Sequence, residues 1–147
     1  MARRVFFSFD HRDLWRANVV RNSMFVDAVM PIGFHDAAAW EEAGQKGEDQ
    51  LNKLIDRALD GTSVTVVLIG AQTASRGYVT YEIERSVARG NALLGIRIDK
   101  IKDLHAVIES PGPIPPALAR ESAPIFEWQY GRLSEWIEEV YHQKHRA

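Results

Sequence analysis

Glu82 is the carboxylate whose position in the sequence is most suited to chemistry. The segment 78–89 repeats apolar residues at helical spacing, with Val79 and Ile83 four positions apart, which predicts an amphipathic helix. At about 100° per residue, Glu82 lies about 60° from Val79, on the border of the buried stripe, whereas Glu84 lies about 140° away and points outward. Such a carboxylate is either a reactive group or a first-turn glutamate stabilised by the helix dipole. Helix geometry leaves both interpretations open.

Several other chemistries lack the residues that they require. The loop 9–13 contains no glycine, which argues against a P-loop or a flavodoxin-type phosphate site. A phospho-receiver domain needs an aspartate where this chain has Ile-Gly-Ala at 69–71. Among the five histidines, metal-ligand spacing occurs at His142 and His145 alone, and there is no Gly-x-Ser-x-Gly elbow. We therefore expect neither a metal site nor a serine nucleophile.

Strands and helices alternate along the chain, and they must position Glu82. Continuous apolar or β-branched runs predict strands at 5–9, 32–36, 63–70, 92–98 and 124–128. Helical spacing of apolar residues predicts helices at 13–29, 51–59, 78–89 and 133–141. This pattern predicts an α/β fold, a flavodoxin-like, open, mostly parallel sheet of about five strands with helices on both faces. The ligand crevice of such a sheet lies beyond the carboxyl ends of its strands, which nominates the segments 8–13, 36–40 and 71–82.

Length and composition set further limits. The 147 residues, 46% of them apolar, suit a single domain over 1–147, with a proline-rich loop at 100–123 and a frayed tail at 142–147. The absence of cysteine agrees with a cytoplasmic location. A net charge of -2 gives no nucleic-acid footprint, and no apolar run approaches the roughly 20 residues of a membrane span, so we expect neither nucleic acid nor a membrane as a partner.

Two segments of the chain resemble TIR domains. The first, 4–10 (Arg-Val-Phe-Phe-Ser-Phe-Asp), is similar to their opening strand. The second, 75–83 (Ser-Arg-Gly-Tyr-Val-Thr-Tyr-Glu-Ile), is similar to their Ser-x-x-Trp-Cys-x-x-Glu-Leu helix start. Three further segments resemble the TIR-like branch that includes the NAD-consuming component of bacterial Thoeris antiphage systems: 16–22, 34–41 and 62–70. No counterpart is identified for 100–123.

The resemblance implies cleavage of the nicotinamide–ribose bond of NAD+, with Glu82 at the position of the catalytic glutamate and NAD+ as substrate, without a further cofactor. Nicotinamide leaves NAD+ as a neutral molecule, so one carboxylate can suffice, unlike in the two-carboxylate glycosidases. Glu82 would stabilise the oxocarbenium-like transition state at the anomeric carbon. The acceptor then sets the product, which is ADP-ribose, a cyclic isomer or a conjugate; the Thoeris likeness favours a cyclic signal.

Seven further residues are candidates for substrate binding, and each also has a structural interpretation. Aromatic residues of strands are more often core residues, a loop aspartate can be merely solvated, and a tryptophan can be a buried anchor rather than a base-stacking surface. The candidates are Ser8, Phe9 and Asp10 after the first strand, Asp36 and Trp40 in the second loop, and Tyr78 and Tyr81 beside Glu82. Similarly, Arg76 and Gly77 either contact phosphate or form a turn.

The resemblance also implies partners. They are a second copy through TIR–TIR contacts, a separate effector protein reached through the nucleotide product, and a phage trigger. Two rival functions stay open on the sequence: a non-catalytic TIR-like interaction module, and a nucleoside N-glycosidic transferase or hydrolase, which would also depend on a glutamate. The second rival would not need the adenylate half of a dinucleotide site.

Overall fold

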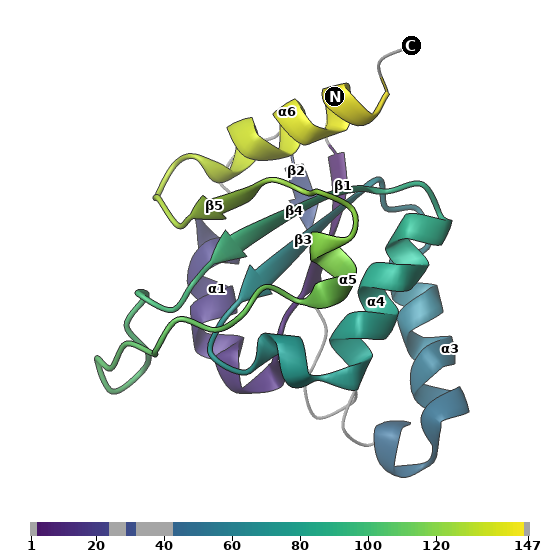
Figure 1. Ribbon diagram of the computed structural model, residues 1–147, viewed down its shortest axis with the longest axis horizontal. Coiled ribbons are helices and arrows are strands. Elements are labelled where there is room, and N and C mark those ends of the chain that lie inside the picture. Colours follow the sequence, from purple (N-terminus) through teal and green to yellow (C-terminus); the bar gives the residue numbers. More distant parts are fainter. Residues whose placement is uncertain (1–2, 24–28, 32–42, 146–147) are drawn as a thin grey trace.

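The computed structural model describes residues 3–23, 29–31 and 43–145 of the chain. Within these residues, five strands form one parallel sheet in the order β2-β1-β3-β4-β5 (Figure 1). The strands are β1 (Arg3–Ser8), β2 (Val29–Pro31), β3 (Val64–Ile69), β4 (Ala92–Arg97) and β5 (Ile125–Glu127). The predicted α/β class with an open parallel sheet is confirmed.

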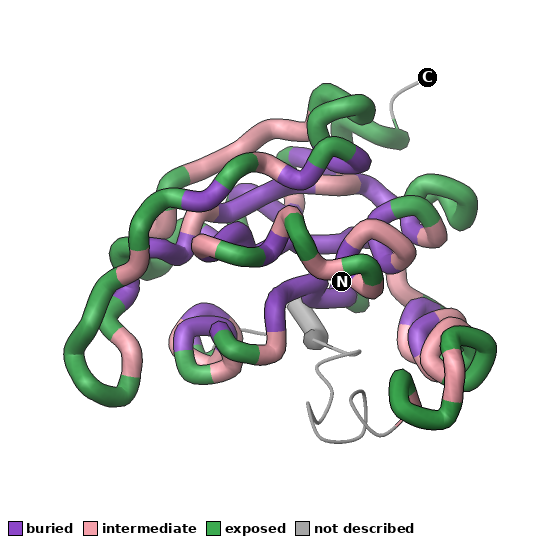
Figure 2. The backbone as a smooth tube through the Cα atoms, turned by 60° about the horizontal axis from the view of Figure 1, so that its bottom comes forward, coloured by how far each residue is buried: buried purple, intermediate pink, exposed green. Residues whose placement is uncertain are grey.

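Helices cover both faces of this sheet. The longer ones are α1 (Leu14–Asn22), α3 (Glu48–Leu59), α4 (Gly77–Ala88) and α6 (Leu133–Lys144), and the short ones are η1 (His11–Asp13), η2 (Thr73–Ser75) and α5 (Pro116–Ala119). Helices α1 and α6 pack on one face, and α3, α4 and α5 pack on the other. Figure 2 shows buried residues concentrated in the strands and exposed residues on the outer turns of the helices. The site helix α4 therefore lies directly on the sheet.

The strand β3 lies at the centre of the sheet and supplies both layers of the core. All six of its residues are buried. Val66 and Leu68 belong to the cluster with α1 and α6, whereas Val67 and Ile69 belong to the cluster with α4 and α5. Successive side chains of a strand point to opposite faces, so a continuous β-branched run is needed to fill both layers.

The first helix is shorter than its apolar spacing predicts. The spacing predicts a helix over 13–29, but α1 ends at Asn22, and the chain from Val29 to Pro31 forms β2, which pairs with β1. The hydroxyl of Ser23 donates to the carbonyl of Val20 at 2.6 Å, which satisfies a carbonyl at the helix end. The predicted strand 32–36 lies outside the described residues.

The C-terminal prediction of a frayed tail from 142 is wrong for the described part of that segment, because α6 continues to Lys144. Its last turns are held by contacts with the start of β1. The Arg3 guanidinium lies 3.6 Å from the centre of the Tyr141 ring, and Arg3 Nε donates to Glu138 Oε2 at 2.8 Å. These tertiary contacts order a turn whose own sequence contains few apolar residues.

The segment 100–123 runs largely without helix or strand, apart from the single turn of α5. Pro116 is the first residue of α5. The N–H of a first helical residue has no partner within the helix, so proline, which lacks this N–H, is well tolerated there. Ala117 and Leu118 of this turn pack with Val79 and Ile83 of α4. Across the described ranges, no helix has both the length and the apolar character to cross a membrane.

Candidate active site

Strand β1 directs one polar side chain toward α4. Phe7 and Phe9 point into the core cluster with α1 and α6, whereas Phe6 packs against α3, Tyr78 and Tyr81 on the opposite face. Because strand residues alternate between faces, Ser8 lies on the face of Phe6 and meets α4. The predicted substrate-binding residue Phe9 is 1% exposed on the far side, so the structure does not bring its ring to Glu82.

Glu82 and Ser8 form a buried pair at the carboxyl end of β1. The Ser8 hydroxyl donates to Glu82 Oε1 at 2.7 Å, and both residues are 0% exposed. Taking a carboxylate out of water is costly unless hydrogen bonds compensate, and the Ser8 hydroxyl supplies one at the distance of a charge-assisted bond. Glu84, two positions along α4, is exposed. The amphipathic prediction for these two glutamates is therefore confirmed.

Tyr78 lies one helical turn before Glu82 on α4. Residues four apart lie one above the other on a helix, with side chains tilted toward its N-terminus. The Tyr78 hydroxyl accepts from the His11 backbone N–H at 2.9 Å, and the two rings stack with centroids 4.6 Å apart. Burial, together with the charges of Asp10 and Glu82, raises the pKa of Tyr78 above its usual value. Tyr78 is therefore a neutral phenol that joins α4 to the turn after β1.

Asp10 and Arg76 close the same junction with opposite charges. Asp10 is 3% exposed, and its Oδ1 accepts from the Arg12 backbone N–H at 3.3 Å, which caps η1. The same oxygen accepts from Arg76 Nε at 3.1 Å and lies 3.5 Å from the Tyr78 hydroxyl. The sequence nominates Asp10 and Tyr78 separately, and the structure brings them together.

A cavity of about 360 Å³ opens at this junction, beyond the carboxyl ends of the strands. Its lining includes three charged residues, Asp10, Arg12 and Arg76, along with His11, Leu51 and Tyr78. Glu82 is not among the described lining residues. Tyr78 lines the cavity and precedes Glu82 by one helical turn, so it is the lining residue of α4 that is nearest to Glu82 in the sequence.

Tyr81 faces a different neighbour. Its hydroxyl donates to the Asp56 carboxylate on α3, 3.2 Å from each oxygen. Arg85 Nε donates to the same Asp56 at 3.0 Å. The Tyr81 ring packs with the α3 cluster, so its observed contacts tie α4 to α3. The other two predicted binding residues, Asp36 and Trp40, lie outside the described residues.

A second buried charge cluster lies near the crevice, and sequence reasoning nominated its Asp13 within the segment 8–13 but missed Arg16 and Glu109. Arg16, 4% exposed, contacts Asp13 at 2.9 Å and Glu109 at 3.5 Å. It also donates to the carbonyls of Ile101 and Val107. Burial first, and then Glu109, raise the pKa of Asp13 to about 7. Glu109 belongs to the proline-rich segment 100–123, where no helical or strand periodicity of apolar residues singles it out.

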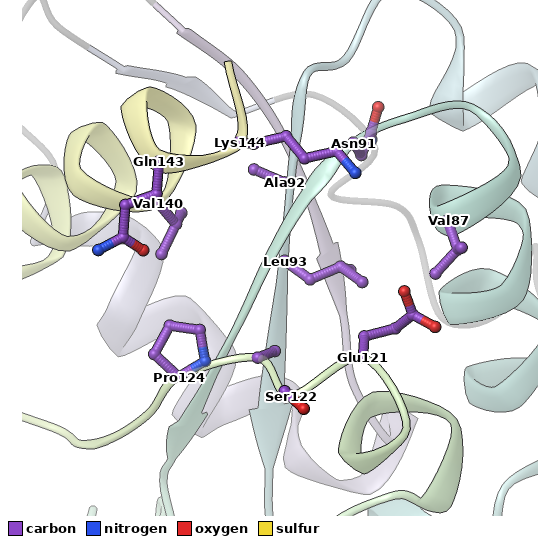
Figure 3. A pocket seen from close by; sticks show the side chains of 11 residues that line it. Val87, Asn91, Ala92, Leu93, Glu121, Ser122, Pro124, Val140, Gln143 and Lys144 are labelled. Carbon is purple, nitrogen blue, oxygen red and sulfur yellow. The ribbon is translucent and has the colours of Figure 1, made fainter. Parts of the chain in front are cut away.

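Figure 3 shows another cavity, of about 250 Å³, at the amino ends of β4 and β5. Val87 and Leu93 point into it, and Glu121 and Lys144 lie at its edges. It is at the opposite end of the sheet from Glu82. Sheets of this class bind ligands beyond the carboxyl ends of their strands, which favours the cavity beside Tyr78 as the candidate site.

Comparison with known proteins identifies the family of this chain. Residues 6–103 match the family model described as the Thoeris protein ThsB, TIR-like domain. The chain is also 39% identical over 146 residues to ThsB1 of Bacillus cereus (strain MSX-D12), which is named as a candidate cyclic ADP-D-ribose synthase. That alignment covers 92% of this chain and 76% of the relative. The matched residues include the last three residues of β1, together with η1 and α4, the elements that build the junction around Glu82. This chain belongs to the family of Thoeris ThsB TIR-like domains.

Proposed function

We propose that this protein cleaves the nicotinamide–ribose bond of NAD+ with Glu82 as the catalytic carboxylate, and that its product is a cyclic ADP-ribose isomer. The observation that carries the proposal is the buried pair of Ser8 and Glu82, one helical turn below a cavity that contains two arginines. Membership of the ThsB family and the name of its Bacillus relative support the same reaction.

The chemistry requires stabilisation of a transient positive charge. The bond between the anomeric carbon and the pyridinium nitrogen breaks, and its electron pair moves to that nitrogen, so nicotinamide departs neutral without a proton donor. The anomeric carbon gains oxocarbenium character, which the Glu82 carboxylate stabilises. A hydroxyl or base nitrogen of the same molecule then attacks this carbon, which closes the ring, and the proton of the attacking group passes to solvent. Burial strengthens the carboxylate's electrostatic effect, because less water screens it.

Ser8 acts through Glu82 in this mechanism. Its hydroxyl donates to Oε1, which holds the carboxylate in one orientation relative to the ribose. Tyr78 stands between the cavity and Glu82, so its ring moves or forms a wall of the nicotinamide pocket when substrate binds. Ser8 is thus a positioning residue, and Tyr78 is a residue of the binding pocket.

The deciding experiment compares two glutamates on one helix. Nicotinamide release from NAD+ is measured by chromatography for the wild type, Glu82→Gln and Glu84→Gln, with the oligomeric state of each determined in parallel. We expect Glu82→Gln to lower the rate at least about 100-fold, the scale for one preorganised electrostatic contact. Glu84, exposed on the same helix, serves as the matched control and should retain the wild-type rate. Equal rates for all three proteins would overturn the role of Glu82.

Mass spectrometry of the product tests the second half of the proposal. Intramolecular attack yields a product lighter than ADP-ribose by one water, whereas attack by water yields ADP-ribose itself. ADP-ribose as the sole product under conditions that activate the enzyme would remove the cyclisation step and leave the hydrolysis.

The setting of the reaction is part of the same proposal. We place this single TIR-like domain in the cytoplasm, where NAD+ is available and where a phage trigger would act. The nucleotide product reaches a separate effector protein, and contacts between copies of the domain complete or regulate the site. Activity measured as a function of protein concentration tests the last point.

A further inference from the structure

The cavity beside Tyr78 has the charge of an anion site. Its lining contains two basic side chains, those of Arg12 and Arg76, and one acidic side chain, that of Asp10, so the basic groups are in excess by one. Asp10 already accepts from Arg76 and from the Arg12 backbone N–H, which offsets much of the repulsion that it would exert on an anionic ligand. An arginine guanidinium is well suited to phosphate, because its planar donors match two phosphate oxygens.

Arg76 is oriented for such a contact. Its Nε donates to Asp10 Oδ1 at 3.1 Å, and Asp10 is itself buried and tied to η1. The two Nη nitrogens of Arg76 donate no hydrogen bond to any of the described residues. The Arg76 side chain is 27% exposed and lines the cavity. One edge of the guanidinium is therefore held by Asp10, and the two Nη donors face no hydrogen-bond acceptor among the described residues.

The spacing along the site suits a nucleotide. Arg76 is the residue at the N-terminal boundary of α4, and Glu82 lies six residues further on, a rise of about 9 Å along the helix. Tyr78 lies between them on the cavity wall. This separation leaves room for one ribose between a phosphate at Arg76 and an anomeric carbon at Glu82.

We propose that Arg76, oriented by Asp10, binds the diphosphate of the substrate and makes the enzyme select a dinucleotide over a nucleoside. The inference rests on the proposed cleavage of NAD+ and assigns its specificity to a residue outside the reacting carboxylate. Arg12, whose exposed side chain lines the same cavity, supplies the second positive charge. Asp10 is a positioning residue for Arg76 rather than a ligand of the ribose.

The test compares two substrates that share the scissile bond. NAD+ carries the diphosphate, and nicotinamide riboside lacks it. For Arg76→Gln we expect the KM for NAD+ to rise about tenfold or more, the scale of one charge-assisted contact, while kcat/KM for nicotinamide riboside stays unchanged. Arg76→Lys, which keeps the charge without the fork, should recover part of the loss.

Arg85→Gln is the matched control. Arg85 lies on the same helix, and its Nε donates to a single aspartate, Asp56, at 3.0 Å, yet it is not among the described lining residues of the cavity. This variant should leave the preference for NAD+ unchanged. An equal loss on both substrates in Arg76→Gln would assign Arg76 a structural role and overturn the proposal, as would no loss on either.

A binding measurement separates this inference from the proposed reaction. Calorimetry with ADP-ribose and with adenosine tests the diphosphate contact without any turnover. We expect Arg76→Gln to weaken ADP-ribose binding about tenfold and to reduce its salt dependence. If the wild type releases no nicotinamide but the ADP-ribose result holds, the reaction is wrong and the anion site stands. If nicotinamide is released but ADP-ribose binds equally to the wild type and Arg76→Gln, the anion site is wrong.

Discussion

The two ends of the sheet each contain a cavity, and the two cavities differ in how their side chains are held. At the carboxyl ends, Arg76, Asp10 and Tyr78 are joined by contacts that cross from α4 to the turn after β1. At the amino ends, the side chains of Gln143 and Lys144 line the cavity of Figure 3 and make no hydrogen bond to any described residue. The polar side chains are therefore held in place by hydrogen bonds in the carboxyl-end cavity, whereas those of Gln143 and Lys144 in the amino-end cavity are not.

This difference shows that preorganisation, more than volume, distinguishes a candidate site. Holding a charged group in place costs conformational entropy during folding, and here that cost falls on residues beside a buried carboxylate. In the amino-end cavity, the hydrogen-bonded side chain is Asn91, which donates to Thr62 and Thr65 inside the fold. Its contacts stabilise the junction between β3 and α4 rather than prepare a surface for a ligand.

The largest expected effect at the carboxyl end concerns the pH dependence of stability. Asp13 has a pKa of about 7 in the folded protein, whereas the ordinary pKa of an aspartate is 3.8. Between these values the native state keeps a proton that the unfolded chain has lost, so the free energy of unfolding falls as the pH rises from about 4 to about 7 and then levels off. We expect a fall on the order of a few kcal/mol, measured by urea denaturation across this range.

Asp13→Asn provides the control for that measurement. The amide does not titrate and can still donate to Glu109, which contributes to the raised pKa of Asp13. The variant should therefore lack the decline between pH 4 and pH 7 that Asp13 causes. A decline of the same size in the variant would show that other groups produce it.

A smaller loss of folding stability is expected from a single methyl group added at Gly70, which follows β3 at its carboxyl end. A Cβ at this position would overlap Asp13 Oδ2 and come within 2.7 Å of Glu109 Oε1. Gly70→Ala should therefore destabilise the protein by about 2 kcal/mol, as overpacking does. Gly77→Ala is the matched control, because a Cβ at Gly77 has no neighbour within 4 Å. Equal stability of the two variants in denaturant titrations would contradict the tight packing of this cluster.

Ser8→Ala tests the positioning of Glu82. The substitution removes the hydroxyl that donates to Oε1, and we expect nicotinamide release to fall about tenfold, equivalent to about 1.4 kcal/mol. The defect should appear in kcat more than in KM, because Ser8 acts on the carboxylate and not on the substrate. Ser134→Ala on α6, which lies on the opposite face of the sheet, serves as the control. Unchanged kcat in Ser8→Ala would remove Ser8 from the mechanism.

The smallest effect is expected at the amino-end cavity. Gln143→Ala changes an exposed lining residue, so the free energy of unfolding should change by less than about 0.5 kcal/mol, and nicotinamide release should not change. A tenfold loss of activity in this variant would break the contrast between the two ends of the sheet.

Most of the fold could be predicted from the sequence, because period and composition act locally. The all-buried strand β3 and the amphipathic helices α3 and α4 follow from apolar patterns that any single chain displays. The prediction failed at the end of α1 and in α6. There, the pairing of β2 with β1 and the contact of Arg3 with Tyr141 decided the outcome. Such contacts join residues far apart in the sequence, and local patterns do not record them.

The candidate site divides in the same way. Helical spacing placed Glu82 at the border of the apolar stripe, and the motif at 75–83 marked it as the residue to test. Local patterns do not reveal the face of β1 to which Ser8 points, and they place both Ser8 and Phe9 near the substrate. The structure shows that Phe9 belongs to the opposite core layer, because alternation along the strand separates neighbours.

The sequence by itself determined the alternation of strands and helices, the parallel sheet and the choice of Glu82 as the carboxylate of interest. The alternation and the sheet follow from residue types and their spacing, which are local properties, whereas Glu82 was singled out by the resemblance of the motif at 75–83 to TIR domains. Only the tertiary structure decided that Asp10, Arg76 and Tyr78 share one junction and that Arg16 holds Asp13 and Glu109 together. Parallel strands carry their carboxyl ends to one edge of the sheet, so residues more than sixty positions apart become neighbours through folding.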